Sequence, residues 1–150
     1  MIVLIICILI AGLLPYIAKI PVAVAMRRAG GYDNHHPREQ QNRLVGMGKR
    51  AVAAHYNFFE AFPFFAAGVI VYMLIRGLVD GISAGSLTAA VHPQDLSMWI
   101  VQVSSILFLV LRLAYLAAYL GDLATLRSLI WSLAYIMAIV PYAAAILLLL

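Results

Sequence analysis

The sequence has few charged residues and almost no cysteine. Only 11% of its 150 residues are charged and 65% are apolar, whereas about 25% of the residues in ordinary soluble domains are charged. A soluble chain of this length leaves much of its surface in water and could not hide so much apolar area in one core. The composition therefore excludes a water-soluble enzyme, a disordered tail and a nucleic-acid module. Cys7 is the only cysteine, which excludes a disulfide scaffold.

Long apolar runs are what the sequence does contain, and each is long enough to cross a bilayer, which takes about 20 helical residues. They lie at about residues 1–26, 51–75, 96–120 and 128–150. Lipid-exposed backbone must satisfy its own hydrogen bonds, so these runs should be helices, and Pro141 should kink the last one. The alternation typical of a membrane barrel is absent. The predicted fold is an all-α integral membrane domain over residues 1–150, a four-transmembrane-helix bundle.

The first apolar run has one feature of a cleavable signal peptide. Its Ala23-Val24-Ala25 segment resembles the small-x-small pattern of a cleavage site. However, no basic residue precedes the run, and the run is long enough to span the bilayer unaided. We therefore expect it to be retained as the first membrane helix.

Basic residues are concentrated in one loop. Six of the ten Lys and Arg residues fall within residues 27–50, whereas the loop at residues 76–95 holds only one. Because basic loops favour the cytoplasmic side, residues 27–50 and 121–127 should be cytoplasmic and both termini exoplasmic. The basic loop is interpreted as a topology signal, with a patch for anionic lipid or an anionic substrate as the alternative. The net charge of +4 therefore does not predict a nucleic-acid partner.

Polar side chains inside two of the spans are candidates for function, because such groups are costly in lipid. One stripe follows one face of the second span and contains Arg50, Asn57 and Glu60. A second stripe follows the third span and contains Arg112, Tyr115 and Tyr119. His55 points away from the Asn57 face and should contact another helix or the headgroup layer.

The two stripes are matched in depth. Glu60 and Arg112 each lie nine residues from the cytoplasmic ends of their spans, which is roughly 13 Å deep. Asn57 and Tyr115 are matched at roughly 9 Å. Because a buried carboxylate needs a partner, we expect a Glu60–Arg112 ion pair. The pair could simply fasten two helices, or the stripes could form a polar cavity that opens to the cytoplasm and suits a ligand with carboxylate and amide groups.

The loop Tyr32-Asp33-Asn34-His35-His36-Pro37-Arg38 contains groups that could bind a metal. Adjacent histidines before a proline are poor shared ligands, and no paired spacing supports a site, so we predict no metal. Asp33 and Asn34 are interpreted as turn formers, and Pro37 as the residue that fixes the loop.

Three passages resemble the MAPEG family, the membrane-associated proteins of eicosanoid and glutathione metabolism. They are the loop Y-D-N-H-H-P-R at residues 32–38, which is similar to the bacterial branch, R-A-V-A-A-H-Y-N-F-F-E-A-F-P at residues 50–63, and R-L-A-Y-L-A-A-Y-L-G at residues 112–121 followed by Arg127. The resemblance covers essentially the whole chain. It implies a homotrimer of four-helix protomers in a bacterial inner membrane, with glutathione bound between neighbouring subunits on the cytoplasmic side.

The resemblance also assigns roles to individual residues. Asn57 and Glu60 match the family's glutathione-contacting asparagine and glutamate, and Tyr115 and Tyr119 lie at the positions of its third-helix polar stripe. Arg50 and Arg112, taken from the two polar stripes described above, join Asn57, Glu60 and Tyr115 as the predicted glutathione-binding residues. Arg127 is similar to the arginine that activates the thiol, and the Tyr119 hydroxyl would donate a hydrogen bond to that thiol. The sequence departs from the glutathione-binding members at two positions. It has Ala53 where they carry arginine, and Tyr56 at a position where they often carry a basic residue. Arg50 shares the Asn57 face and could substitute for the missing arginine.

Three functions remain open on these residues. The first is a glutathione-dependent transferase or peroxidase acting on hydrophobic electrophiles. The second is a non-catalytic membrane scaffold, or a protein that binds lipid or a partner and has lost glutathione chemistry, which Ala53 and Tyr56 favour. The third is a transporter or channel subunit, which no acidic relay or broken-helix pair supports. In each case we predict self-association. Polar groups lie on several faces of the second span, and the small residues beside them would let a neighbouring helix approach closely.

Overall fold

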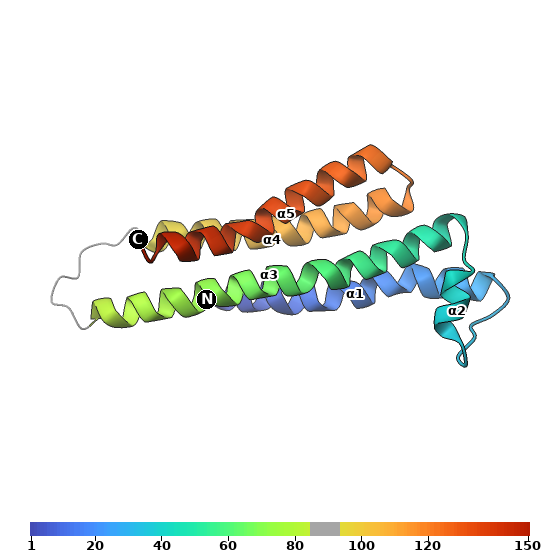
Figure 1. Ribbon diagram of the computed structural model, residues 1–150, viewed down its shortest axis with the longest axis horizontal. Helices are drawn as coiled ribbons and strands as arrows, with labels where there is room; N and C mark the ends of the chain where they lie inside the picture. The colour runs from blue at the N-terminus through green and yellow to red at the C-terminus, as the bar shows by residue number, and fades with distance from the viewer. Residues whose placement is uncertain (85–93) are drawn as a thin grey trace.

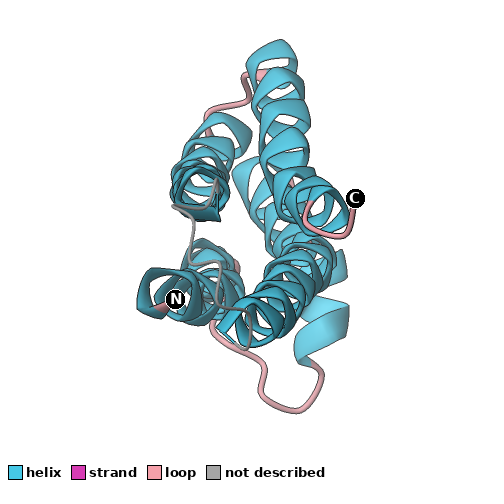
Figure 2. Ribbon diagram, turned by 90° about the vertical axis from the view of Figure 1, so that its left-hand side faces the viewer, coloured by secondary structure: helices cyan, strands magenta, loops and turns pink. Residues whose placement is uncertain are grey.

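The computed structural model describes residues 1–84 and 94–150, and within these ranges all regular structure is helical (Figures 1 and 2). The helices are α1 (Ile2–Arg28), α2 (Pro37–Asn42), α3 (Gly46–Ala84), α4 (Gln94–Leu120) and α5 (Ala124–Leu147). Four of them, all except α2, are long and apolar enough to cross a membrane. The predicted fold class, an all-α membrane protein with four spanning helices, is therefore confirmed.

The helix boundaries differ from the expected spans at α2, α3 and α5. Helix α5 begins at Ala124 rather than near Ser128, so Arg127 lies in its first turn rather than in a loop. The third helix begins at Gly46 rather than near Ala51, and it continues past residue 75 to Ala84. An i,i+4 ion pair between Arg76 and Asp80, 2.8 Å long, supports this extension beyond the apolar run. Helix α2 is too short to be detected from periodicity, although its first residue, Pro37, favours a helix start. The rest of the expected second loop, residues 85–93, lies outside the described residues.

The four long helices form two antiparallel pairs, α1 with α3 and α4 with α5, and α3 also packs on both α4 and α5 (Figure 1). The rings of Phe65 on α3 and Phe108 on α4 stack with their centroids 4.1 Å apart. Between α1 and α3, the buried His55 side chain meets the Pro15 carbonyl oxygen at 2.8 Å through Nδ1. The expectation that His55 points away from the Asn57 face and contacts another helix is therefore confirmed.

Helix α5 changes direction along its length, and its N-terminal part moves away from α3 (Figure 1). Pro141 lies inside this helix and cannot donate the backbone hydrogen bond that a straight helix requires there. Beyond the bend, α5 is fastened to α3, because the Tyr142 hydroxyl donates to the Phe64 carbonyl oxygen at 2.9 Å. The two helices are thus close at the Tyr142 level and separate toward the other end.

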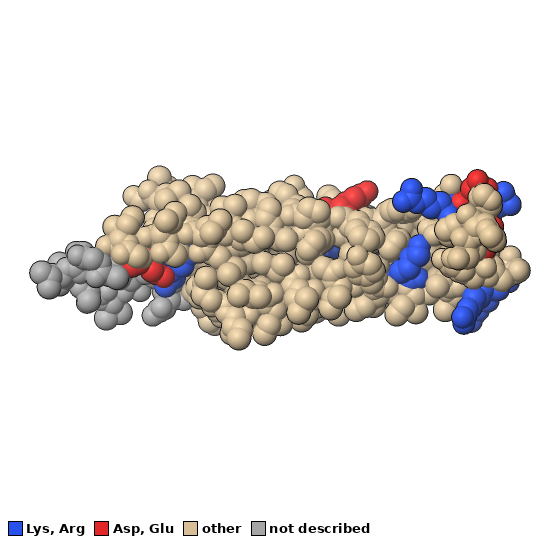
Figure 3. Space-filling view, turned by 90° about the horizontal axis from the view of Figure 1, so that it is seen from below, with Lys and Arg blue, Asp and Glu red and all other residues tan. Residues whose placement is uncertain are grey.

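The basic residues gather at the end of the molecule where α2 lies, while the long middle of the surface is largely uncharged (Figure 3). The loop before α2 is held by Asp33, whose Oδ1 accepts hydrogen bonds from the backbone N–H groups of His35 and His36 at 2.8 and 3.0 Å. These two bonds lower the pKa of the Asp33 carboxyl below its usual value. Asp33 thus forms the turn that its sequence context predicts. Within the described ranges, no three His, Cys, Asp or Glu side chains are grouped as metal ligands would be.

We predict that Gly68→Ala destabilises the contact between α3 and α5. A Cβ atom at Gly68 would lie 2.6 Å from Tyr142 Cε2 and 2.8 Å from Cδ2, and the ring cannot swing away freely because its hydroxyl is bonded to Phe64. Such overpacking costs about 1–3 kcal/mol, and the loss should appear as a lower midpoint of thermal unfolding in detergent. Gly77→Ala on the same helix is the control, because nothing lies within 4 Å of its Cβ. Equal midpoints for the two variants would contradict the prediction.

Candidate functional site

Three adjoining pockets run between α3 and the α4–α5 pair. The inner pocket shares Asn57 and Trp131 with the middle pocket, and the middle pocket shares Tyr119 and Arg127 with the outer pocket. The outer pocket reaches Lys49 and Asp122 at the basic end of the bundle. Together they form a continuous trough from the charged end of the molecule toward its apolar middle.

The structure brings all seven predicted site residues to this trough. Glu60 and Arg112 line the inner pocket, Tyr115 lines the middle pocket, and Arg50 lines the outer pocket. The remaining three, Asn57, Tyr119 and Arg127, lie at the two shared boundaries. Side chains that are distant in sequence therefore share one surface of one protomer.

Arg112 is the most deeply buried charged residue of the site, with 2% of its surface exposed. Its Nη2 donates to the Asn57 Oδ1 at 3.0 Å, and its guanidinium carbon lies 4.4 Å from the centre of the Phe58 ring and 4.6 Å from that of Tyr115. Its Nε is buried and has no hydrogen-bond partner in the described part of the chain. The protein therefore holds this cation with one amide oxygen and two ring faces, and leaves one donor unused.

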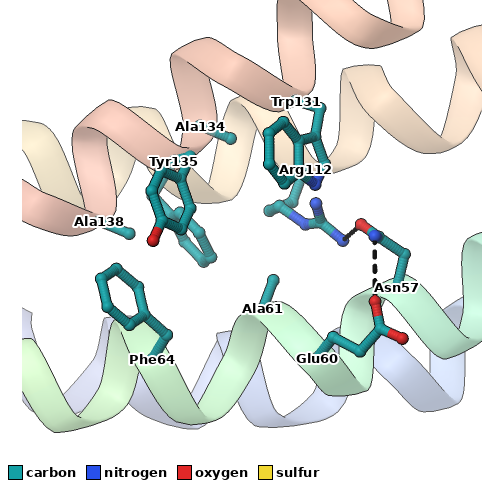
Figure 4. A pocket seen from close by; sticks show the side chains of 10 residues that line it. Asn57, Glu60, Ala61, Phe64, Arg112, Trp131, Ala134, Tyr135 and Ala138 are labelled. Atoms are coloured by element: carbon teal, nitrogen blue, oxygen red, sulfur yellow. Dashed lines mark hydrogen bonds between the residues drawn. The ribbon is translucent and has the colours of Figure 1, made fainter.

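The prediction of an ion pair between Glu60 and Arg112 is wrong. Asn57 lies between them, accepting from Arg112 and donating through Nδ2 to the Glu60 Oε2 at 3.3 Å (Figure 4), and the Glu60 side chain is exposed. Three residues along a helix turn a side chain by about 60° around the axis. Asn57 consequently faces α4, whereas Glu60 is rotated toward the outer surface of α3, and equal distance from the helix ends does not bring it to Arg112.

Tyr119 and Arg127 face each other across the junction of α4 and α5. The Arg127 guanidinium carbon lies 4.5 Å from the centre of the Tyr119 ring, and the Tyr119 and Tyr115 rings meet edge to face at 5.4 Å. The turn between the helices brings them together, with Asp122 in the left-handed region at a φ of 62°. A cation is thereby stacked on the face of a phenol ring at the boundary of the middle and outer pockets.

Arg50 fastens α3 to the end of α4. Its Nη1 lies 3.1 Å from the Asp122 Oδ2, and its Nη2 donates to the Leu120 carbonyl oxygen at 3.4 Å. A cation is favourable beside the C-terminus of a helix, where carbonyl groups carry partial negative charge. The Arg50 Nε is buried without a partner among the described residues, and Ala53 lies beside Arg50 in the outer pocket.

Helix α5 contributes residues that sequence reasoning missed. Trp131, Tyr135 and Ala138 line the inner pocket, and Ser128 and Ser132 line the middle pocket. The depth match between the second and third spans does not involve the fourth span. The pairs Ser128–Ser132 and Trp131–Tyr135 are each four residues apart, and this spacing would have indicated a common face of α5.

The trough combines charges of both signs with an apolar end. Its cations are Lys49, Arg50, Arg112 and Arg127, and its carboxylates are Glu60 and Asp122. Three buried side-chain atoms in the described residues have no hydrogen-bond partner, and two of them are the guanidinium Nε atoms of Arg50 and Arg112. The trough is therefore charged toward one end and lined by rings and methyl groups toward the other.

Comparison with known proteins gives one result. The model of the MAPEG family matches residues 3–147 of the 150. No curated protein and no solved structure matches the chain.

Replacing Asn57 tests how Arg112 is held. In Asn57→Leu the buried guanidinium loses a hydrogen bond, which should lower the free energy of unfolding by about 1.5–3 kcal/mol. In the double variant Asn57→Leu/Arg112→Met the loss should be smaller, because no buried charge is left unsatisfied and the thioether keeps contact with the rings. Denaturant unfolding in detergent micelles measures both. A double variant that is less stable than Asn57→Leu alone would contradict this description of Arg112.

Proposed function

The chain belongs to the MAPEG family of membrane proteins, and from this premise we propose that it is a glutathione-dependent transferase or peroxidase that acts on hydrophobic electrophiles. The observation that carries the proposal is the Tyr119–Arg127 pair in the trough. The Arg127 guanidinium carbon lies 4.5 Å from the centre of the Tyr119 ring. One side of the pair leads to the charged end of the molecule, and the other leads to an apolar pocket within the bundle. A polar thiol donor and an apolar acceptor could therefore approach the same place from opposite sides.

The residues of the trough fit the chemistry of glutathione, which carries two carboxylates, an amine and a thiol. The guanidinium groups of Arg50 and Arg127, which both line the outer pocket, can donate to carboxylate oxygens. The exposed Glu60 carboxylate can accept from the amine. The middle and outer pockets enclose about 420 and 350 Å³, which lies within the range of small-molecule sites, about 300–1,000 Å³.

Arg127 and Tyr119 are the proposed catalytic residues. Bound glutathione would supply a thiol, whose reactive form is the thiolate. The positive charge of Arg127 favours that form, and the Tyr119 hydroxyl can donate a hydrogen bond to it. Because the same charge acts on any acceptor that reaches the trough, one arrangement can support both transfer to electrophiles and reduction of hydroperoxides.

A non-catalytic membrane protein that binds lipid or a partner is the second candidate, and Ala53 is the observation that favours it. The outer pocket has a methyl group at this position, and the neighbouring Arg50 is engaged by Asp122. If these features have removed glutathione chemistry, calorimetry with millimolar glutathione will show no heat of binding. A measurable heat of binding together with turnover of an apolar electrophile would exclude this candidate in favour of the first.

We further propose that three copies assemble, with the second spanning helix of each, α3, lining a shared centre. Tyr56 and Glu60 are both exposed on α3 within its membrane span. A carboxylate at this depth must face protein or water rather than lipid, so this face requires a partner or a wet cavity. The number three follows from family membership, and the need for association follows from these side chains.

We also propose that the basic end, which contains residues 27–50 and 121–127, faces the cytoplasm of a bacterial cell. The cluster of Lys and Arg residues at that end supports this orientation (Figure 3). Both termini would then be exoplasmic, and the trough would open toward cytoplasmic glutathione.

Removing the Arg127 charge should reduce the proposed activity. An ordinary thiol with a pKa near 8.5 is only about 3% thiolate at pH 7, so Arg127→Ala should lower kcat/KM by as much as about 30-fold there. The deficit should shrink as the pH approaches 9, because the thiol then ionises without help. Rates measured with an apolar electrophile across this pH range check the prediction.

Arg43→Ala is the matched control for this experiment, since the Arg43 side chain is exposed just after α2 and pairs with Glu39 across 3.6 Å. It should leave the rate and its pH profile unchanged. A wild-type protein that binds glutathione but reacts no faster than Arg127→Ala would remove Arg127 from the mechanism.

The assembly is tested by the mass of the protein in detergent. Light scattering corrected for bound detergent should give a protein mass close to three times the 16.4 kDa of one chain. A folded particle with the mass of a single chain would contradict both the assembly and any site shared between subunits.

A further inference from the structure

The inner pocket is small and is walled by rings. It encloses about 100 Å³ and lies between α3, α4 and α5. A cavity of about 150 Å³ lined by apolar side chains is known to hold one benzene molecule. At about two-thirds of that volume, the inner pocket admits no more than one six-membered ring, and it is too small for a drug-sized ligand or a folded acyl chain.

Its walls form a stack of nearly parallel rings. Trp131 and Tyr135 of α5 lie 5.5 Å apart between centroids with 8° between their planes, and Tyr135 and Phe64 of α3 lie 5.1 Å apart with 11° between theirs. Offset parallel rings at such distances attract one another beyond the effect of burial alone. A further flat ring can extend this arrangement, whereas a puckered saturated ring cannot make the same face contact.

Space for that ring comes from alanines. Ala134 and Ala138 line the pocket beside Trp131 and Tyr135 on α5, and Ala61 lines it on α3, the helix that carries Phe64 (Figure 4). Ala138 is 1% exposed, so its methyl group faces other protein atoms rather than lipid. The mouth of the pocket is polar, because Asn57 and Arg112 lie at the side that continues into the middle pocket.

We propose that the inner pocket binds one flat conjugated ring of the electrophile, so that the protein prefers aryl substrates to saturated ones of equal size. The substituent that reacts would point past Asn57 toward Tyr119 and Arg127. The inference deepens the proposed function and rests on it for the reaction, but binding of the ring itself needs no glutathione. Tyr135 and Ala138 would then determine specificity without taking part in the chemistry.

Binding of the ring can be measured with the chain's own fluorescence. The protein has two tryptophans, Trp99 and Trp131, and Trp99→Phe leaves Trp131 as the only reporter. Iodobenzene and iodocyclohexane are the probes, since both enter micelles and both quench through iodine. Iodobenzene should quench Trp131 in a saturable manner, whereas iodocyclohexane should give only a linear increase with concentration.

Variants of one helix locate the effect. Ala138→Leu fills the pocket and should remove the saturable phase, and Ala143→Leu makes the same change at an exposed position of α5 and should keep it. Because leucine at Ala138 could disturb folding, Tyr135→Leu at a half-exposed position provides a second test. It removes one ring from the wall and should weaken iodobenzene binding at least 5-fold. Saturable quenching by iodocyclohexane equal to that by iodobenzene, or an unchanged response in both variants, would overturn the inference.

A kinetic comparison separates this inference from the proposed function. Benzyl and cyclohexylmethyl isothiocyanate carry the same reacting group. The glutathione sulfur adds to the central carbon of this group, and its nitrogen takes the proton. The wild type should prefer the benzyl compound at least 5-fold in kcat/KM, and Tyr135→Leu should reduce the preference to near one. Turnover of both compounds at equal rates, without saturable quenching, would overturn the ring site and leave the transferase intact. Saturable quenching without any turnover would overturn the transferase and leave the ring site.

Discussion

A buried guanidinium within the membrane-spanning part of the bundle is the constraint on which the rest of the site depends. Arg112 is fully enclosed, and it can remain charged only if protein groups replace the water that it has lost. Asn57 provides one oxygen, and Phe58 and Tyr115 provide the negative faces of their rings. To bring these groups within reach, α3 and α4 must turn their polar stripes toward each other. The same orientation places the apolar faces of both helices against the Phe65–Phe108 stack.

From that contact the trough extends in two chemically different directions. Toward the basic end it is bordered by exposed charges and by the turn at Asp122. Toward the middle of the bundle it is bordered by rings and methyl groups of α3, α4 and α5. The bend of α5 near Pro141 keeps this end closed against α3, where Tyr142 fastens the two helices, while the other end stays open (Figure 1). A molecule that is polar at one end and meets an apolar partner at the other matches this gradient.

The fold could be predicted from the sequence because length and hydropathy alone decide which segments cross a bilayer. The candidate residues could be predicted because polar groups are rare inside such segments. The contacts within the site depend on how far each helix is rotated about its axis and on how the helices pack together. Glu60 and Arg112 are equally deep by residue count, but a turn of about 60° separates Glu60 from Asn57. Trp131 and Tyr135 could not be assigned from depth matching of two spans, because only the packed bundle shows that α5 completes the pocket.

The position of Arg50 explains how the outer pocket could keep its charge although Ala53 replaces a basic residue. Arg50 lies about one turn nearer the membrane surface and is held by Asp122, whose side chain is 69% exposed. Exposed ion pairs of this kind contribute only about 0–1 kcal/mol, because water screens both charges. A carboxylate that entered the outer pocket could therefore displace Asp122 at little cost. The internal pair thus orients Arg50 across the pocket without consuming its capacity to bind an anion.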